Sequence, residues 1–344
     1  MGVHDEAALA RLRDKRIIVT GGRGFLGTEV VRLLRSVGVG SIHVGSSLEH
    51  DLRITEKAFA LVQTHPADIV INLAARLGGI GDNRAHPASY FYDNLMIGVN
   101  MIDACRLHGV AKLVNIGTVC SYPKNAPVPF REEHIWDGFP EETNGPYGIS
   151  KRATIVYSQA VKAQYGFSTV NLLLTNLYGP GDDFRDETSH VIPAIIKKVL
   201  RAKELSAPEI VAWGDGSPSR DFLHVHDAAR AVALAAAACE DSRPVNVGSG
   251  TEVRIKALID HIIRIVGYEG SIAWDTSKPN GQPRRVLDIT LARQLFGFEP
   301  EKPFARGLEE TVAWYLANRS EIDHQAPKHR DLSPFDAVRS SSAG

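Results

Sequence analysis

A glycine-rich turn near the start of the chain constrains the fold more than any other feature. The segment TGGRGFLG at residues 20–27 follows a β-branched run, RIIVT at 16–20, and opens a helical pattern at 24–37. Glycines at positions 21, 24 and 27 permit a tight turn and close packing of the helix on the strand. A strand, a glycine turn and a helix in this order are typical of the first unit of a doubly wound parallel sheet.

The same alternation continues through the first half of the chain. Short apolar runs predict further strands, and patterns of helical period lie between them. Strands that alternate with helices form parallel sheets, so we predict an α/β fold: a Rossmann-type doubly wound parallel sheet with a smaller C-terminal substrate-binding lobe. The predicted strands are 41–44, 68–73, 111–116 and 168–174, and the predicted helices are 55–64, 89–108, 146–165 and 191–201.

The domain organisation follows from where this alternation loosens. We expect a dinucleotide-binding domain at 1–175, to which later segments at about 220–250 return. A mainly substrate-binding lobe is expected at 176–320, and the polar end at 321–344 is expected to be a flexible tail.

Charge and composition narrow the function classes. A formal net charge of −1 over 344 residues gives no field that attracts nucleic acid or a membrane surface, so neither is an expected partner. No apolar run approaches the roughly 20 residues of a membrane span, and the charged start does not resemble a signal peptide. Three cysteines, Cys105, Cys120 and Cys239, are too few and too scattered for a disulfide framework or a zinc cluster. These features predict a cytoplasmic enzyme.

The glycine turn also predicts a cofactor. Free N–H groups and a partial positive charge at a helix N-terminus bind a pyrophosphate. No acid follows the strand at 41–44, where one would favour NAD, and Arg23 in the turn suits a 2′-phosphate. NADP (as NADPH) is therefore the expected cofactor, with NAD as the alternative. The predicted cofactor contacts are Gly21, Arg23, Gly24, Phe25, Leu26, Gly27, Asp51, Leu52, Ala74, Ala75, Tyr147 and Lys151.

Tyr147 and Lys151 form a Y-x-x-x-K pattern on a predicted helix. A spacing of four places both side chains on one helix face. A free tyrosine is a poor base at neutral pH, and we expect the lysine ammonium and the nicotinamide charge to lower its pKa so that the phenol exchanges a proton with a carbonyl oxygen. Thr118, at the end of the preceding strand, is placed to hydrogen-bond the same oxygen.

Several longer segments carry a family resemblance. They are AARLGGI at 74–80, CSYPK at 120–124, TNLYGP at 175–180, SHVIPA at 189–194, WGDG at 213–216, RDFLHV at 220–225 and KPNG at 278–281. With the glycine turn and the Tyr/Lys pair, they resemble the extended short-chain dehydrogenase/reductases, and within them the GDP-L-fucose synthase family, the GDP-4-keto-6-deoxy-mannose 3,5-epimerase/4-reductases.

The resemblance implies further roles. Cys120 and His190 match the cysteine and histidine with which that family moves protons at C3 and C5; from the residues alone, a buried apolar cysteine and a loop histidine are the plainer interpretations. It also implies a GDP-sugar substrate and a homodimer formed through the helices at 89–108 and 146–165. The implied substrate-binding residues are Asn176, Lys198, Trp213, Arg220 and Lys278.

Departures from the family pattern leave alternatives open. Val119 replaces a serine and Lys198 an arginine, so the sugar is open to question. One alternative is a redox-neutral GDP-sugar epimerase (C4 or C3/C5) with tightly bound NAD that acts on a heptose or octose. A second is a plain GDP-4-keto-sugar 4-reductase, and a third is a non-catalytic nucleotide-binding protein. His224 and His226 lack a third ligand, so no metal is expected.

Overall fold

A six-stranded parallel sheet is the centre of the molecule. The computed structural model describes residues 3–186, 188–278 and 280–323. The strand order is β2-β1-β3-β4-β5-β9, and each neighbouring pair runs parallel. The strands are β1 (Arg16–Thr20), β2 (Ser41–Val44), β3 (Ile69–Asn72), β4 (Lys112–Thr118), β5 (Ser168–Leu174) and β9 (Pro244–Val247).

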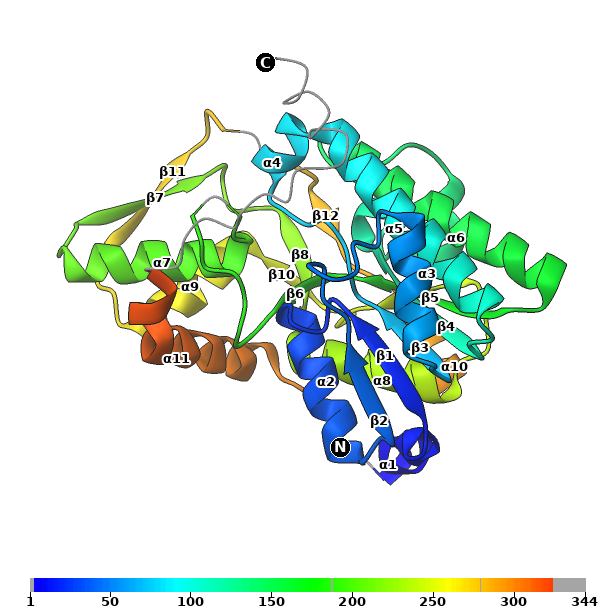
Figure 1. The fold of residues 1–344 in the computed structure, drawn as a ribbon. Coiled ribbons are helices and arrows are strands. Elements are labelled where there is room, and N and C mark those ends of the chain that lie inside the picture. Colours follow the sequence, from blue (N-terminus) through cyan, green and yellow to red (C-terminus); the bar gives the residue numbers. More distant parts are fainter. Residues whose placement is uncertain (1–2, 187, 279, 324–344) are drawn as a thin grey trace, which may run out of the picture.

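Helices cover both faces of this sheet (Figure 1). One face carries α1 (Val3–Leu9), the short 3-10 turn η1 (Ala10–Leu12), α2 (Phe25–Val37), α8 (Val225–Ala238) and α10 (Thr290–Phe296). The other carries α3 (Thr55–Thr64), α5 (Pro87–Leu107) and α6 (Gly145–Tyr165). The predicted Rossmann-type α/β fold is therefore confirmed.

The apolar runs read from the sequence are strands buried on both sides. In β1, Ile17 and Val19 pack into the cluster beneath α2 and α8, whereas Ile18 packs into the cluster beneath α3 and α5. Successive side chains of a strand point to opposite faces, so a strand covered by two helical layers needs apolar residues at every position. This explains why RIIVT shows no polar alternation.

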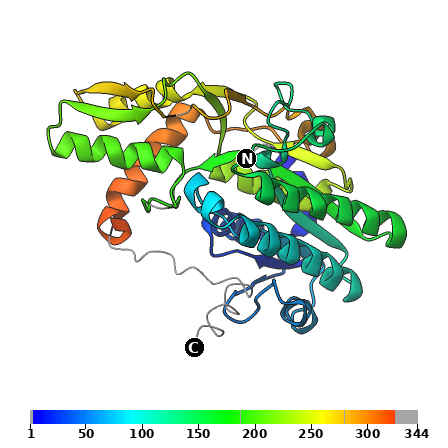
Figure 2. The same ribbon diagram turned by 90° about the horizontal axis from the view of Figure 1, so that it is seen from above.

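A smaller lobe lies beside one end of the sheet, as Figures 1 and 2 show from two directions. The second sheet has the order β10-β8-β12 with β6 paired to β8, and β7 and β11 form a two-stranded ribbon. The elements of the smaller lobe are β6 (Asn176–Tyr178), α7 (Val191–Glu204), β7 (Glu209–Trp213), β8 (Ser219–His224), β10 (Glu252–Arg254), α9 (Ile255–Val266), β11 (Ser271–Asp275), β12 (Arg284–Arg285) and α11 (Phe304–Asp323).

The lobe has an apolar core of its own. In α9, the buried residues Leu258, Ile259, Ile262 and Val266 recur at helical spacing and pack against α7 and α11. Tyr178 and Phe222 bring the paired strands β6 and β8 into the same cluster.

Some elements were not predicted from the sequence. Up to α7 they are α1, η1, the short helix α4 (Ile80–Ala85), the 3-10 turns η2 (Val119–Ser121) and η3 (Glu132–Trp136), and β6; after α7 they are the strands β7 to β12 and the helices α9, α10 and α11. Of the predicted tail, residues 321–323 end α11, and the remainder lies outside the described residues. Within the described ranges, no helix combines the length and apolar character that a membrane span requires.

Candidate active site

The glycine turn between β1 and α2 is shaped by close backbone contacts. Gly21 has φ +65°, and a Cβ there would lie 2.9 Å from the Ala74 amide nitrogen. A Cβ on Gly27 would overlap the Gly21 carbonyl and lie 2.6 Å from the Gly22 Cα. Gly24 N–H donates to the Gly21 carbonyl at 3.0 Å, and Gly24 then caps α2 without a side chain. The turn therefore leaves the first amides of α2 open to an anion, which fits a bound pyrophosphate.

Polar contacts fix the turn against the end of β3. Thr20 donates its hydroxyl to Asn72 Oδ1 at 2.7 Å, and the Ala74 amide donates to that hydroxyl at 3.3 Å. β2 and β3 lie on opposite sides of β1, so the connection after β1 and the connection after β2 run in opposite directions across the sheet. Ligands of open parallel sheets bind at this switch in strand order.

The other predicted cofactor contacts differ in their exposure and in the residues that they already contact. Arg23 is exposed and borders a small pocket that it shares with Thr28 and Pro180. The Asp51 carboxylate is engaged by Arg53, at 2.7 Å between Oδ2 and Nη2, and Leu52 is buried. Phe25 and Leu26, at the start of α2, are partly buried, as are Ala74 and Ala75, which follow β3.

Tyr147 and Lys151 lie one turn apart in α6, and both are buried. Thr118 is the last residue of β4, and α6 packs against this strand. Burial raises the pKa of Tyr147 and the charge of an ionised Cys120 raises it further, while a hydrogen bond from Thr118 lowers it. Tyr90 crosses the Tyr147 ring edge-on with 6.4 Å between centroids. These contacts bring Thr118, Cys120 and Tyr147 together.

Lys151 does not act on Tyr147 in the way we expected. Its ammonium donates to the Ile116 carbonyl at 3.1 Å, and burial lowers the pKa of Lys151 to about 8. The effects resolved on the pKa of Tyr147 come from burial, Cys120, Thr118 and Tyr90, and their net direction is upward. No effect of the ammonium on the Tyr147 pKa is resolved, and burial, the largest cause, sets the upward direction, so the expected lowering by the ammonium is not found; the lowering expected from the nicotinamide charge stays a prediction.

Cys120 lies in the 3-10 turn η2 directly after β4. Its amide donates to the Thr118 hydroxyl at 3.2 Å, and its partly buried thiol lies 3.8 Å from Nη1 of Arg285. A Cβ on Gly148 would overlap the Cys120 carbonyl, so α6 packs directly on this turn. The glycine after Tyr147 thus allows the Tyr/Lys helix to approach the cysteine.

His190 lies in the other half of the molecule. It precedes α7 in an extended conformation, and its side chain is exposed. The structure thus collects Thr118, Cys120, Tyr147 and Lys151 and leaves His190 on the lobe.

The predicted substrate residues are spread over four elements of the lobe, β6, α7, β7 and β8, and the loop after β11. Trp213, at the end of β7, is 70% exposed, with the Lys278 ammonium 6.0 Å from its ring centre. Asn176 donates to the Asp221 carbonyl at 3.0 Å, and Lys198 donates to the Val211 carbonyl at 2.8 Å. Arg220 bonds the carbonyls of Ser219 and Gln282, so its guanidinium is held in place.

Arg285 is a site residue that sequence reasoning missed. It pairs in register with Arg220 across β12 and β8. The pKa of Arg220 is lowered to about 10, chiefly by burial and also by the neighbouring Arg285 charge, while Cys120 opposes this lowering. The pattern PRR at 283–285 gave no reason to prefer one arginine over the other before the pairing of β12 was known.

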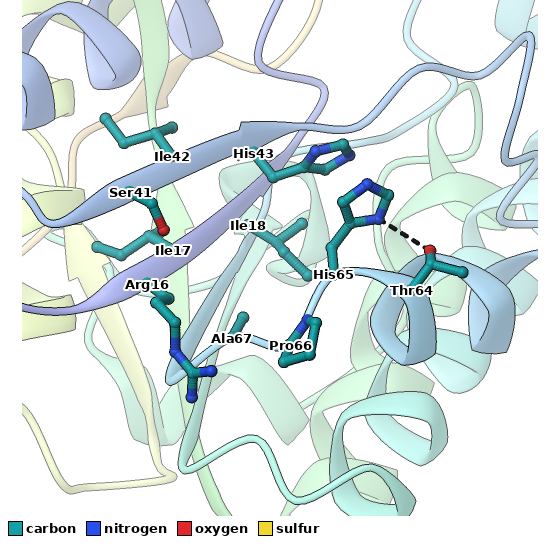
Figure 3. Close-up of a pocket in the computed structure, with 10 residues that line it drawn as sticks. All are labelled: Arg16, Ile17, Ile18, Ser41, Ile42, His43, Thr64, His65, Pro66 and Ala67. Atoms are coloured by element: carbon teal, nitrogen blue, oxygen red, sulfur yellow. Dashed lines mark hydrogen bonds between the residues drawn. The ribbon is translucent and has the colours of Figure 1, made fainter.

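A hollow elsewhere contains none of these residues. It has a volume of about 280 Å³ and lies between β1, β2 and the turn after α3. Figure 3 shows His43 and His65 stacked there, with 3.5 Å between ring centres. Among the described residues no group of three or more His, Cys, Asp and Glu side chains is arranged to hold a metal ion.

A glycine turn at the switch point, with a Tyr/Lys helix packed on the end of β4 in the same sheet, is typical of the nucleotide-cofactor enzymes built on this fold. The family model described as "NAD dependent epimerase/dehydratase family" matches residues 17–248, and the chain belongs to that family.

The relatives narrow the class further. The probable GDP-L-fucose synthase 1 of Oryza sativa subsp. japonica is 40% identical over 310 residues, which cover 89% of this chain and 94% of the relative. The GDP-L-fucose synthetase of Naegleria fowleri bound to NADP superposes with a TM-score of 0.82 at 28% identity, covering 90% of this chain and 94% of that one. A GDP-6-OMe-4-keto-L-xylo-heptose reductase from C. jejuni has a TM-score of 0.84 at 25% identity, covering 89% and 99%. The resemblance read from the motifs is confirmed.

Proposed function

We propose that this protein is an NADPH-dependent 3,5-epimerase/4-reductase of a GDP-4-keto-6-deoxyhexose. The observation that carries the proposal is the cluster of Thr118, Cys120 and Tyr147 at the end of β4, at the same edge of the parallel sheet as the glycine turn. It joins a hydroxyl pair suited to a ketone oxygen with a thiol suited to a neighbouring carbon. The NADP named for the N. fowleri relative and the absence of an acid after β2 support NADPH over NAD.

The first proposed role belongs to Tyr147. When bound, NADPH supplies the hydride that reduces C4. Because its pKa is raised, Tyr147 holds its proton at neutral pH and gives it to the C4 oxygen as the alkoxide develops. Thr118 holds the same oxygen, and the Lys151 ammonium, one turn along the helix, is proposed to stabilise the phenolate that remains.

The second role belongs to Cys120 and His190. The carbons beside a ketone are acidic because the carbanion left behind is delocalised onto the ketone oxygen. We propose that the Cys120 thiolate removes the proton from one face and that His190 returns a proton on the other. Since His190 is exposed on the lobe, this role requires the lobe and the sheet to enclose the sugar between them.

The remaining site residues are proposed to bind the nucleotide. Trp213 offers an exposed ring for the guanine base, and Arg220 suits a diphosphate because its guanidinium bonds in a fork. Asn176 is proposed to face the sugar, and Lys198 and Lys278 to add charge near the phosphates. In this arrangement the division at residues 175–176 separates cofactor binding from binding of the nucleotide part of the substrate.

One experiment tests the proposal. The protein is incubated with GDP-4-keto-6-deoxy-mannose and NADPH in deuterated water, the nicotinamide absorbance is followed, and the product is identified by NMR. The proposal predicts loss of NADPH with deuterium at C3 and C5. No loss of NADPH would contradict it and favour the redox-neutral epimerase, to be sought by releasing bound NAD and testing larger GDP-sugars.

A plain 4-reductase is the second candidate. Two observations favour it: the likeness to the C. jejuni heptose reductase, and Val119, which cannot donate a hydrogen bond to the sugar. In that case the same experiment gives loss of NADPH without deuterium, and Cys120 and His190 are bystanders.

We also propose a homodimer and a cytoplasmic location. Leu107 on α5 and Val156 and Tyr165 on α6 are exposed although large and apolar, and α5 packs against α6. Apolar side chains on two adjacent helices suit pairing with a second copy. Sedimentation at micromolar concentration that gives a monomer would contradict the dimer.

The three free cysteines support the proposed cytoplasmic location, because thiols stay reduced in that compartment.

A further inference from the structure

Two neighbouring arginines of β12 point in opposite directions. Arg284 bonds the Glu252 carboxylate at 3.0 Å and is exposed. Arg285 is partly buried, with its Nη1 3.8 Å from the Cys120 sulfur. Successive side chains of a strand point to opposite sides, so the pairing of β12 with β8 determines which arginine reaches the thiol. Only Arg285 of this pair contacts the reacting sulfur.

Gln282 holds this arrangement together. Its side-chain oxygen accepts from Nη2 and Nε of Arg285 at 2.9 and 3.1 Å, which leaves Nη1 directed at Cys120. Its backbone carbonyl accepts from Arg220 at 2.7 Å. Its side-chain amide donates to the Lys124 carbonyl at 2.9 Å, four residues beyond the cysteine. One residue thus positions both guanidinium groups and ties them to the segment that carries the thiol.

The charged and titratable groups that face Cys120 come from three elements. Arg285 of β12 and Arg220 of β8 lie side by side, and each opposes the charge of the other. An anion between them relieves that repulsion. Tyr147 of α6 is the third group, and an ionised Cys120 helps to raise the pKa of Tyr147. A thiolate at this position therefore suits both its cationic neighbours and a Tyr147 that must keep its proton.

We infer that Arg285, held by Gln282, stabilises the thiolate of Cys120 and so prepares it to act as the base. The thiol proton leaves to solvent, and the thiolate then takes the proton from the sugar carbon. Thiols beside a guanidinium ionise more readily than free thiols. The part played in epimerisation rests on the proposed function, whereas the stabilisation of the thiolate does not.

Alkylation of Cys120 tests the inference without substrate. Iodoacetamide labelling of Cys120 is followed by mass spectrometry across pH 6–10. The other two cysteines, Cys105 and Cys239, are buried, so they do not compete for the reagent. Arg285→Gln should slow labelling at pH 7 by about tenfold, which corresponds to roughly one pH unit in the profile. Arg285→Lys keeps the charge and should restore labelling to within about threefold of the unmodified protein. Arg284→Gln is the matched control and should leave the profile unchanged.

Two results would overturn the inference. One is an Arg285→Gln protein that labels as the unmodified protein does at every pH, even if its KM for the GDP-sugar rises. The other needs no variant: Cys120 of the unmodified protein labelled at pH 7 no faster than a free thiol. In deuterated water, Arg285→Gln should also lose deuterium incorporation at pH 7 and recover it at pH 9. If the unmodified protein exchanges no deuterium while its labelling depends on Arg285, the proposed function fails and this inference stands.

Discussion

The cofactor half and the substrate half of the candidate site are built in different ways. On the sheet, the binding surface is backbone: Gly21 and Gly27 leave no room for a side chain, and the turn is held by Thr20 and Asn72. On the lobe, it consists of long side chains on short strands, and Trp213 is mostly exposed. In the glycine turn, a substitution that weakens cofactor binding should also lower the stability of the protein, because the binding surface is closely packed backbone. Exposed side chains of the lobe can be altered without unfolding the protein. The predictions below test this contrast.

The largest expected effect is on the chemistry that the sheet half supports. Tyr147→Phe removes the proton donor to the C4 oxygen and preserves the buried ring, so the hydride step should slow by about 10²–10⁴-fold. Because the ring packs against Tyr90, the unfolding temperature should change little. Stopped-flow loss of NADPH absorbance measures the step, and an unchanged rate would exclude Tyr147 as the donor.

A glycine substitution tests the rigidity of the cradle. Gly27→Ala places a methyl group against the Gly21 carbonyl, which is backbone and cannot move aside. Overpacking of this kind costs about 1–3 kcal/mol, and NADPH binding should weaken with it. Thermal unfolding and NADPH fluorescence titration measure the two effects. Gly81→Ala is the control, because nothing lies within 4 Å of its added Cβ; equal behaviour of the two variants would contradict the close-packed turn.

Lys151, also in the sheet half, tests how much the burial of a charge lowers the stability of the protein. Its pKa of about 8 lies below the usual 10.5, so the unfolded chain binds more protons between these values and stability rises with pH there. Lys151→Met should therefore stabilise the protein at pH 7 by about 1–3 kcal/mol while stopping reduction, and this gain should fade by pH 10. Urea unfolding at both pH values measures it, with the exposed Lys57→Met as control.

The smallest expected effect is on the lobe. Trp213→Ala removes a ring that is 70% exposed, so stability should change by less than about 0.5 kcal/mol. Loss of stacking on the guanine should raise KM by about tenfold. Trp136→Ala removes another exposed tryptophan and should change neither quantity. A large loss of stability in Trp213→Ala would break the comparison between the two halves.

The same contrast explains what could be predicted from the sequence. Local patterns encode the sheet half: the glycine turn, the apolar strands and the Tyr147/Lys151 spacing each lie within a few residues. Their positions agree closely with the observed elements, as β1, β2 and β5 show.

Contacts between distant segments could not be predicted in this way. Arg285 reaches Cys120 across 165 residues of chain, and it does so only because β12 pairs with β8 in one register. A sequence that reads PRR does not say which arginine points inward. The pKa of Tyr147 was also misjudged, because a spacing of four residues predicts the proximity of Lys151 and not the depth of burial.

The central claim is that one site carries two separable reactions, proton exchange at Cys120 and hydride transfer at Tyr147. The most direct test is Cys120→Ser in deuterated water with NADPH, using both GDP-4-keto-6-deoxy-mannose and its pre-epimerised ketone. The account predicts loss of deuterium at C3 and C5, with reduction of the pre-epimerised ketone largely intact. Equal loss of both activities would contradict it and make Cys120 a structural residue.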